Sequence, residues 1–220
     1  MKIIAHIHTD FESKFGVPRQ SGLIDTAATI VFEPPYRVAE AMRGLEDFSH
    51  IWILWQFSEA VREDWSPTVR PPMLGGNTRM GVFATRSPFR PNPIGLSCVK
   101  LERVEISPTL GPVLHVTGAD LMNGPPIYDI KPYLPFTDAH PDAIGGFTQT
   151  VADRTVTVAD PRNCLARVRE DKRDALLAVL ASDPRPTYQH DPERVYGFGF
   201  AGYEIRFRVD GGTLTIDEIL

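Results

Sequence analysis

Residues 97–117 read SCVKLERVEISPTLGPVLHVT and contain two runs rich in β-branched residues, Ser97–Ile106 and Val113–Thr117. The residues between the two runs are too few for the crossover helix that parallel neighbours need, so an antiparallel pair is predicted. Short runs of the same kind occur on both sides, at Ile3–Ile7, Thr29–Phe32, Ile51–Trp55, Met80–Thr85 and Asp129–Leu134. The first part of the chain is therefore predicted to form a mainly antiparallel β-barrel.

Two segments have the spacing of an amphipathic helix. The first opens with Pro34 and Pro35, and its apolar positions are Val38, Met42, Leu45 and Phe48. The second ends at residues 183–186, where two prolines stop a helix, and its apolar positions are Leu165, Val168, Leu176, Val179 and Leu180.

The clearest hairpin surrounds the glycine pair 211–212, because apolar residues alternate before it and resume after it. With a two-residue turn, Val209 faces Leu214. Phe207 then faces Ile216, so the apolar faces of the two strands agree in register.

A change of composition divides the chain. Residues 138–146 are rich in small, polar and proline residues, which is typical of a boundary between domains. We therefore predict an α+β protein with two domains. A β-barrel would occupy residues 1–138, and a small α+β domain would occupy residues 139–220.

The bulk composition is that of an ordinary globular protein, with 42% hydrophobic and 23% charged residues in 220. No apolar run approaches the roughly 18–20 residues of a membrane span, and the N-terminal sequence lacks the features of a signal peptide. Cys98 and Cys164 lie far apart in apolar surroundings, as reduced thiols would. We expect a soluble protein of the cytoplasm that does not bind membranes.

Charge is distributed unevenly. The formal net charge is −5, yet the segment from Trp65 to Lys100 contains no Asp or Glu. Its arginines are Arg70, Arg79, Arg86 and Arg90. A local positive field on an acidic protein suits a defined anionic ligand. The alternative interpretation is that carboxylates elsewhere in the fold pair with these arginines.

Residues 85–97 combine three prolines with Arg86, Arg90 and Asn92. Proline restricts the backbone, so a loop of this kind can present guanidinium groups to a carboxylate or phosphate at little entropic cost. A stiff structural turn with solvated arginines is the alternative. Residues 17–20, Val-Pro-Arg-Gln, show the same pattern more weakly.

Two further segments carry polar groups. Residues 119–126 end a predicted strand in a Gly-Pro turn, where backbone groups are available to a ligand. Asp129, Lys131 and Tyr133 alternate along one strand and so share one face. A structural strand with a salt bridge would explain that spacing equally well.

His6 and His8 also share a strand face, as the ligands of a metal-dependent phosphoesterase can. Such a site needs further ligands, and the remaining histidines stand singly at His50, His115, His140 and His190. The glycine motifs of Rossmann and P-loop proteins and the Gly-x-Ser-x-Gly elbow are absent from the sequence. We therefore predict no metal.

Several segments, taken together, resemble the TsaA-like or TrmO family of S-adenosylmethionine-dependent tRNA N6-methyltransferases. The resemblance runs in colinear order along nearly the whole chain. It is carried by residues 14–20 (KFGVPRQ), 43–52 (RGLEDFSHIW), 70–77 (RPPMLGGN), 80–97, 129–135 and 183–188 (DPRPTY).

The resemblance implies a barrel without a Rossmann fold, a homodimer, and a methyl donor bound near the subunit interface. The substrate would be N6-threonylcarbamoyladenosine at position 37 of tRNA, beside the anticodon. Carried over by position, the donor contacts would be Pro18, Arg19, Gln20, Ser58, Glu59, Arg86, Leu96, Asp120, Leu121, Met122 and Asn123. This chain has Ser58-Glu59 where relatives have His-Gln, and Asn123 where relatives often have Asp.

A division of roles follows from this resemblance. Arg86 would hold the donor carboxylate, and Asp120 would lie near its sulfonium. Asp129 or Tyr133 would accept the proton that leaves the target nitrogen. The tRNA would be met by Arg70, Arg79, Arg90, Asn92 and Lys131, with the arginines on phosphates. A module that binds a nucleoside or S-adenosylmethionine without turnover is the main alternative, and the metal phosphoesterase is the other.

Overall fold

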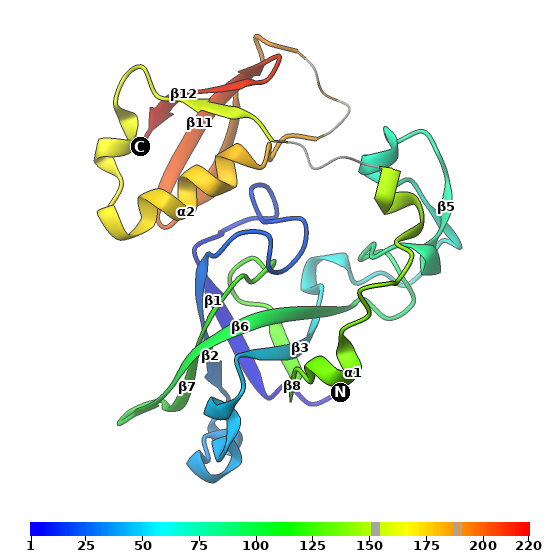
Figure 1. Cartoon of the computed structure of the whole chain (residues 1–220), viewed down its shortest axis with the longest axis vertical. Coiled ribbons are helices and arrows are strands. Elements are labelled where there is room, and N and C mark those ends of the chain that lie inside the picture. The colour runs from blue at the N-terminus through cyan, green and yellow to red at the C-terminus, as the bar shows by residue number, and fades with distance from the viewer. Residues whose placement is uncertain (151–154, 187–188, 190) are drawn as a thin grey trace.

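The computed structural model describes residues 1–150, 155–186, 189 and 191–220 (Figure 1). Thr187 and Tyr188, which belong to the last segment of the resemblance, and the lone His190 lie outside the described residues.

The predicted antiparallel barrel is confirmed. Six strands close on themselves in the order β1-β2-β7-β6-β3-β8, and each neighbouring pair is antiparallel. The strands are β1 (Ala5–Thr9), β2 (Ala27–Phe32), β3 (His50–Gln56), β6 (Ile94–Ser107), β7 (Gly111–Thr117) and β8 (Pro126–Pro132).

Alternation explains why these residues build a closed core. Along β3, Ile51, Ile53 and Trp55 are buried while the residues between them are less covered, because successive strand residues face opposite sides. Ile30 of β2 and Leu114 of β7 pair directly and are both fully buried. Each such aliphatic side chain contributes about 1.5–3 kcal/mol through burial.

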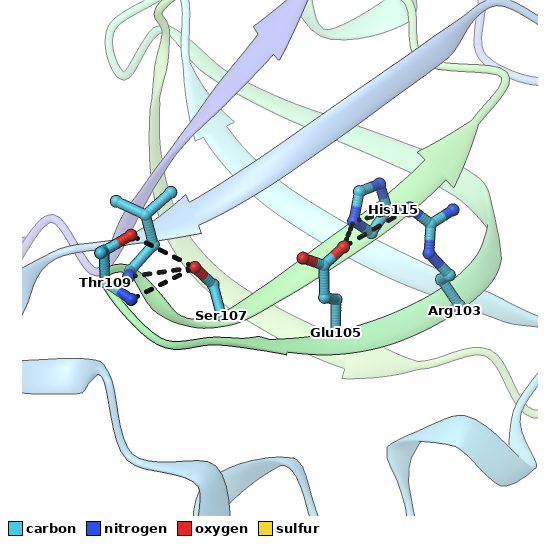
Figure 2. Close-up of polar contacts among 6 residues, drawn as sticks. Arg103, Glu105, Ser107, Thr109 and His115 are labelled. Carbon is cyan, nitrogen blue, oxygen red and sulfur yellow. Dashed lines mark hydrogen bonds and ion pairs between the residues drawn. The ribbon is translucent and has the colours of Figure 1, made fainter.

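Polar contacts hold the far end of the β6–β7 hairpin (Figure 2). The Glu105 carboxylate contacts His115 Nε2 at 2.8 Å and accepts from Arg103 Nη2 at 3.5 Å. Ser107 Oγ accepts from the backbone N–H of Thr109 at 3.4 Å. Arg103 and Glu105 follow the start of β6 by roughly ten residues, or about 33 Å of strand. These polar contacts therefore lie far from the end of the barrel at which β6 begins.

Two predictions for the first part were wrong. Residues 34–48 form three short 3-10 turns, η1 (Pro34–Tyr36), η2 (Ala39–Met42) and η3 (Leu45–Asp47), instead of one helix. Gly44 has a φ of +81°, which no continuous α-helix allows. The predicted strand Met80–Thr85 is reduced to β5 (Met80–Gly81), followed by η6 (Val82–Ala84), because its partner β4 (Thr68–Val69) is equally short.

Strand ends also differ from the predicted ones. β1 begins two residues later than Ile3 and continues to Thr9. β8 begins at Pro126, because residues 126 and 127 pair with β1 and close the barrel. It ends at Pro132, and α1 (Pro135–Asp138) follows.

Residues 61–93 form a long excursion between β3 and β6, here called the arginine lobe. It contains β4, β5, η5 (Pro72–Leu74) and η6, and it stands away from the barrel in Figure 1. Pro71 and Val82 are its buried residues, whereas Trp65 and Phe83 are 51% and 72% exposed. The lobe therefore has almost no core of its own.

The C-terminal part is a four-stranded sheet in the order β10-β11-β12-β9, covered by α2 (Glu170–Ala181). Its strands are β9 (Thr157–Ala159), β10 (Tyr196–Phe200), β11 (Tyr203–Asp210) and β12 (Thr213–Ile219), and the short turn η8 (Cys164–Arg167) precedes α2. The turn η7 (Gly146–Thr150) follows α1 in the chain. The predicted hairpin register is confirmed, because Val209 pairs with Leu214 and Phe207 pairs with Ile216.

The second predicted helix is shorter than expected. Leu165 belongs to η8, and Val168 is extended with a ψ of 138°, so α2 begins only at Glu170. Its buried residues are Leu176, Val179 and Leu180. Within the described residues, no helix combines the length and the apolar character that a bilayer crossing requires.

The segment between β1 and β2, residues 10–26, is called the β1–β2 connection. Although it begins and ends in the barrel, Phe11 and Ile24 belong to the hydrophobic core of the C-terminal sheet. In Figure 1 it lies between the barrel and α2. The two parts of the fold are thus joined by packing as well as by the chain.

Candidate active site

A cavity of about 700 Å³ lies where the β1–β2 connection, β3 and the residues after it, the arginine lobe, the start of β6 and the β7–β8 connection meet. That volume is within the range of pockets that bury a small organic ligand. Five parts of the fold therefore build its wall, and residues distant in sequence meet in it.

Three arginines line this cavity. Arg86 Nη1 donates to Gln20 Oε1, and Arg19 Nη2 donates to the backbone carbonyl oxygen of Asp183 at 2.9 Å. Arg90 Nη1 donates to the carbonyl oxygen of Thr85 at 3.1 Å. Because each is anchored by a neutral acceptor, the positive charges remain available to an anionic group.

A hydrogen-bonded chain of three side chains lines another part of the wall. Trp55 Nε1 donates to Ser97 Oγ at 3.0 Å, and Ser97 Oγ donates to Asp120 Oδ1 at 2.5 Å. Burial raises the pKa of Asp120 above its ordinary value, although the hydrogen bond from Ser97 and the charge of Arg86 oppose the shift. A partly buried carboxylate of this kind would be stabilised by a ligand cation.

Aromatic rings form an apolar wall beside these groups. Trp55 and Phe57 are in contact, with ring centroids 4.2 Å apart, and both line the cavity. Gly95 makes this possible, because a Cβ there would lie 2.2 Å from the Trp55 ring. The two rings are tilted by 55° to each other, and they give the cavity an apolar wall against which a ligand ring could pack.

The structure brings most of the predicted site residues together. The predicted residues that line the cavity are Pro18, Arg19, Gln20, Ser58, Glu59, Arg86, Arg90, Asn92, Leu96, Asp120 and Met122. Glu59 also forms an ion pair with Lys14 at 2.9 Å.

The other predicted site residues lie elsewhere. Leu121 is fully buried in the barrel core, and the Asn123 Oδ1 accepts from the backbone N–H of Thr9 at 3.3 Å. Arg70 and Arg79 are exposed on the arginine lobe. Asp129, Lys131 and Tyr133 are not among the residues that line the cavity.

Asp129 and Lys131 lie on β8, whereas Tyr133 follows the last residue of that strand. Asp129 and Lys131 form an ion pair at 3.1 Å, and both are largely exposed. The ring of Tyr133 lies 5.7 Å from that of Trp52, which does line the cavity. Tyr133 is thus one aromatic ring removed from the site.

Sequence reasoning missed Ser97, Trp55 and Trp52 as site residues. Ser97 carried a signal, because it is a polar residue among the buried positions of β6, which it shares with Gly95, Val99 and Leu101. The two tryptophans carried no such signal. Alternation along a strand predicts which side of the sheet a residue faces, but it does not predict which residues lie next to it.

His6 is engaged in local contacts. Its Nδ1 lies 2.8 Å from the carbonyl oxygen of Gly124, and its Nε2 lies 3.4 Å from Glu33. In the part of the chain that the structure describes, no three His, Cys, Asp or Glu residues are grouped as metal ligands would be. The described residues therefore offer no set of metal ligands that would support the metal phosphoesterase hypothesis.

Comparison with known proteins gives two family matches. The model of the tRNA-methyltransferase O N-terminal domain matches residues 6–139, and that of the TrmO C-terminal domain matches residues 155–220.

Individual relatives agree with these matches. A protein of Escherichia coli strain K12 named tRNA (adenine(37)-N6)-methyltransferase is 42% identical over 215 residues, which covers 94% of this chain and 91% of that protein. One of the same name from Eikenella corrodens is 47% identical over 175 residues, or 79% and 97% of the two chains. A crystal structure of TrmO from Pseudomonas aeruginosa superposes with a TM-score of 0.79 at 32% identity, covering 99% of this chain and 97% of that one.

Proposed function

This chain belongs to the tRNA-methyltransferase O family, and from that membership we propose that it transfers a methyl group from S-adenosylmethionine to N6 of adenine 37 in tRNA. The observation that carries the proposal is the match of both family models, in order, over residues 6–139 and 155–220. The cavity adds a chemical argument, because its charged groups suit this methyl donor.

The donor carries a carboxylate, a sulfonium and an adenine ring, and when bound it supplies the electrophilic methyl group. Arg86 is proposed to hold the carboxylate through a charge-assisted pair of hydrogen bonds. Asp120 is proposed to face the sulfonium, since a nearby cation favours its ionised form. Trp55 and Phe57 offer the apolar wall for the ring.

The target is proposed to be N6-threonylcarbamoyladenosine. Its N6 belongs to a urea-like group, so its N–H is more acidic than that of plain adenine and needs only a modest base. Catalysis would then rest mainly on alignment of the target nitrogen with the methyl group and the sulfur. The acidic residues that line the cavity are Asp120, which accepts from Ser97, and Glu59, which is paired with Lys14. Asp129 or Tyr133 as the proton acceptor stays a prediction.

The tRNA is proposed to approach over the arginine lobe. Arg70, Arg79 and Arg90 would meet phosphates of the anticodon arm, which positions the substrate without reading its sequence. Asn92 lines the cavity near Arg90, where it could contact the nucleotide. Lys131 is paired with Asp129, so a role on the RNA would require it to exchange that partner.

A homodimer is proposed for the same protein. Its support is the arginine lobe, which leaves Trp65 and Phe83 exposed and buries few of its own side chains. Large exposed apolar side chains of this kind commonly mark contact surfaces. We also propose a division into domains at residues 138–139, and a cytoplasmic location that suits a tRNA substrate.

The direct test is mass analysis of nucleosides from tRNA incubated with S-adenosylmethionine and the protein. We expect the modified adenosine to gain one methyl group, and Arg86→Ala at the same protein concentration to produce much less product. A module that binds the donor without turnover is the alternative. Donor binding with no methylated product would favour that alternative.

A further inference from the structure

The β1–β2 connection reaches the cavity only after passing through the C-terminal core. Phe11 is fully buried there, and its ring meets that of Phe200 at 5.4 Å. Phe15 lies parallel to the Phe207 ring at 6.4 Å and edge-on to Phe198 at 6.1 Å. The C-terminal sheet therefore holds the first part of the connection, whereas Ser21 Oγ accepts from the backbone N–H of Cys98 in β6 at 3.1 Å.

Two close contacts make this attachment rigid. Gly16 has a φ of +93°, and a Cβ on it would lie 2.5 Å from the Phe198 ring, so the backbone itself lies against β10. Asp10 forms an ion pair with Lys172 of α2 at 2.5 Å, and both side chains are less than a fifth exposed. The cavity-lining residues Pro18, Arg19 and Gln20 follow directly after Gly16 and Val17.

A buried ion pair lies behind Arg19. Both oxygens of the Asp183 carboxylate accept from Arg185 Nε, at 2.9 and 3.1 Å, and the two residues are 2% and 8% exposed. Asp183 has a φ of +52°, a strained conformation for a non-glycine residue that its surroundings must hold in place. Its backbone carbonyl oxygen accepts the 2.9 Å hydrogen bond from Arg19 Nη2.

The contacts continue from Arg19 to the cavity. Gln20 Nε2 donates to the carbonyl oxygen of Arg19 at 2.5 Å, and Gln20 Oε1 accepts from Arg86. Arg185, Asp183, Arg19, Gln20 and Arg86 thus form one connected series. It begins in the C-terminal part and ends at the side chain proposed to hold the donor carboxylate.

We propose that Asp183 and Arg185 are positioning residues for the methyl-donor pocket, and that the C-terminal sheet serves to fix Arg19, Gln20 and Arg86. The inference rests on the proposed function. It assigns to the C-terminal part a task in donor binding, through the buried pair and the strained turn after α2. Coupling between two sites is reciprocal, so donor binding should also tighten that turn.

The test is calorimetric titration of the full chain with S-adenosylhomocysteine, which needs no turnover and no tRNA. Asp183→Asn keeps the size of the side chain and tolerates a positive φ, and the double change Asp183→Asn with Arg185→Gln leaves no unpaired buried charge. We expect each to weaken binding by about five- to tenfold, the low end of couplings between protein sites. The matched control is Val209→Ala, which removes buried side-chain volume from the C-terminal core at a position far in sequence from this turn. It should bind S-adenosylhomocysteine as wild type does.

A double-mutant cycle separates positioning from loss of stability. In an Arg19→Ala background the contact to Asp183 is already gone, so Asp183→Asn should weaken binding no further. Hydrogen exchange of the Ser182, Asp183 and Arg185 amides should slow when S-adenosylhomocysteine is added to wild type, and not when it is added to Arg19→Ala.

The outcomes are distinguishable. No binding by the wild-type protein would overturn the proposed function itself. Wild-type affinity in both Asp183 variants would overturn the positioning role. The positioning role would also be overturned if Val209→Ala lost as much donor affinity as the Asp183 variants. Additive losses of affinity in the double-mutant cycle would overturn it too. In either case the buried pair would act only through the stability of the core.

Discussion

Arg86 and Gln20 meet at the wall of the cavity through a guanidinium and a neutral amide. A carboxylate ligand can therefore compete for the guanidinium without having to displace an acidic partner. Arg86→Ala should weaken donor binding by roughly ten- to a hundredfold, because a hydrogen bond to a charged group contributes about 1.5–3 kcal/mol. Calorimetry with S-adenosylhomocysteine measures this, and Arg79→Ala, on the lobe and outside the cavity lining, is the control. If wild type, Arg86→Ala and Arg79→Ala bound S-adenosylhomocysteine with equal affinity, Arg86 would not be part of the donor site.

The ionised Asp120 side chain should lower the stability of the folded protein while it favours binding of the donor. Burial raises its pKa, so the folded protein holds this proton more tightly than the unfolded chain does. The ionised carboxylate therefore destabilises the fold above its raised pKa, and the penalty disappears as pH falls below the ordinary carboxyl range. Asp120→Asn should melt at the same or a higher temperature than wild type near neutral pH, with the difference vanishing in acid.

The same Asp120→Asn protein should bind the donor more weakly, because an amide cannot neutralise a sulfonium. Asp129→Asn is the matched control, since Asp129 pairs with the largely exposed Lys131 and does not line the cavity. A protein that loses thermal stability and keeps donor affinity would show that Asp120 is structural.

At the scale of single residues, sequence reasoning located the charged part of the site better than its apolar part. Arg19 and Arg86 stood out because charged residues beside prolines need a reason to be there, whereas Asp120 was carried over from the family resemblance. Trp55 and Ser97 did not, because each also fits an ordinary strand. Their hydrogen bond depends on the register between β3 and β6, in which Ile53 pairs with Ser97, and that register is set by tertiary packing.

The arginine lobe is the element that should govern RNA binding. Arg79 and Arg90 are proposed to meet phosphates, and each contact of this kind releases condensed counterions. Removing either arginine should lower the magnitude of the slope of log K against log salt by about 0.7–0.9. Filter binding of tRNA at several salt concentrations measures it for wild type, Arg79→Ala and Arg90→Ala. Parallel lines for the three proteins would mean that these side chains do not face RNA.

Elements were predictable where local chemistry determined them. The β11–β12 hairpin was predicted to the residue pair, since a two-residue glycine turn leaves one register that buries both apolar faces. The segment 34–48 shows the opposite case. Its apolar spacing suits a helix, yet Val38 is extended and half exposed while Met42 packs into the barrel core, so tertiary contacts outweigh the periodicity.

For the whole molecule, the β1–β2 connection makes one cooperative unit of two cores. Phe11→Ala should destabilise the C-terminal sheet by about 3–5 kcal/mol, although residue 11 lies in the first part of the chain. Urea unfolding followed by hydrogen exchange of the β10–β12 amides measures this. Ile127→Ala, in the barrel core, is the comparison variant. A separate early transition that leaves these amides protected in Phe11→Ala would show that the two cores unfold independently.

Neither the shared core nor the cavity could be read from the sequence as a whole-molecule property. The division into a barrel and a C-terminal sheet followed from composition and periodicity, which are local. The placement of Phe11 and Ile24 in the distant core depends on contacts across nearly 190 residues, and no local pattern encodes such a contact.

The burial of Phe11 against Phe200 also orders events on the ribosome. Translation proceeds at roughly 5–20 residues per second, so Phe11 waits about 10–40 s for the strand that covers it. During that interval Phe11 and Phe15 are exposed in the nascent chain. Arg19 and Gln20 form part of the cavity wall, and this part can adopt its final structure only after strands β10–β12 have been synthesised. A chain released before β10 is made would lack the packing partner of Phe11, and the carbonyl group that accepts from Arg19 would be newly made at most, so this part of the cavity wall would lack its support.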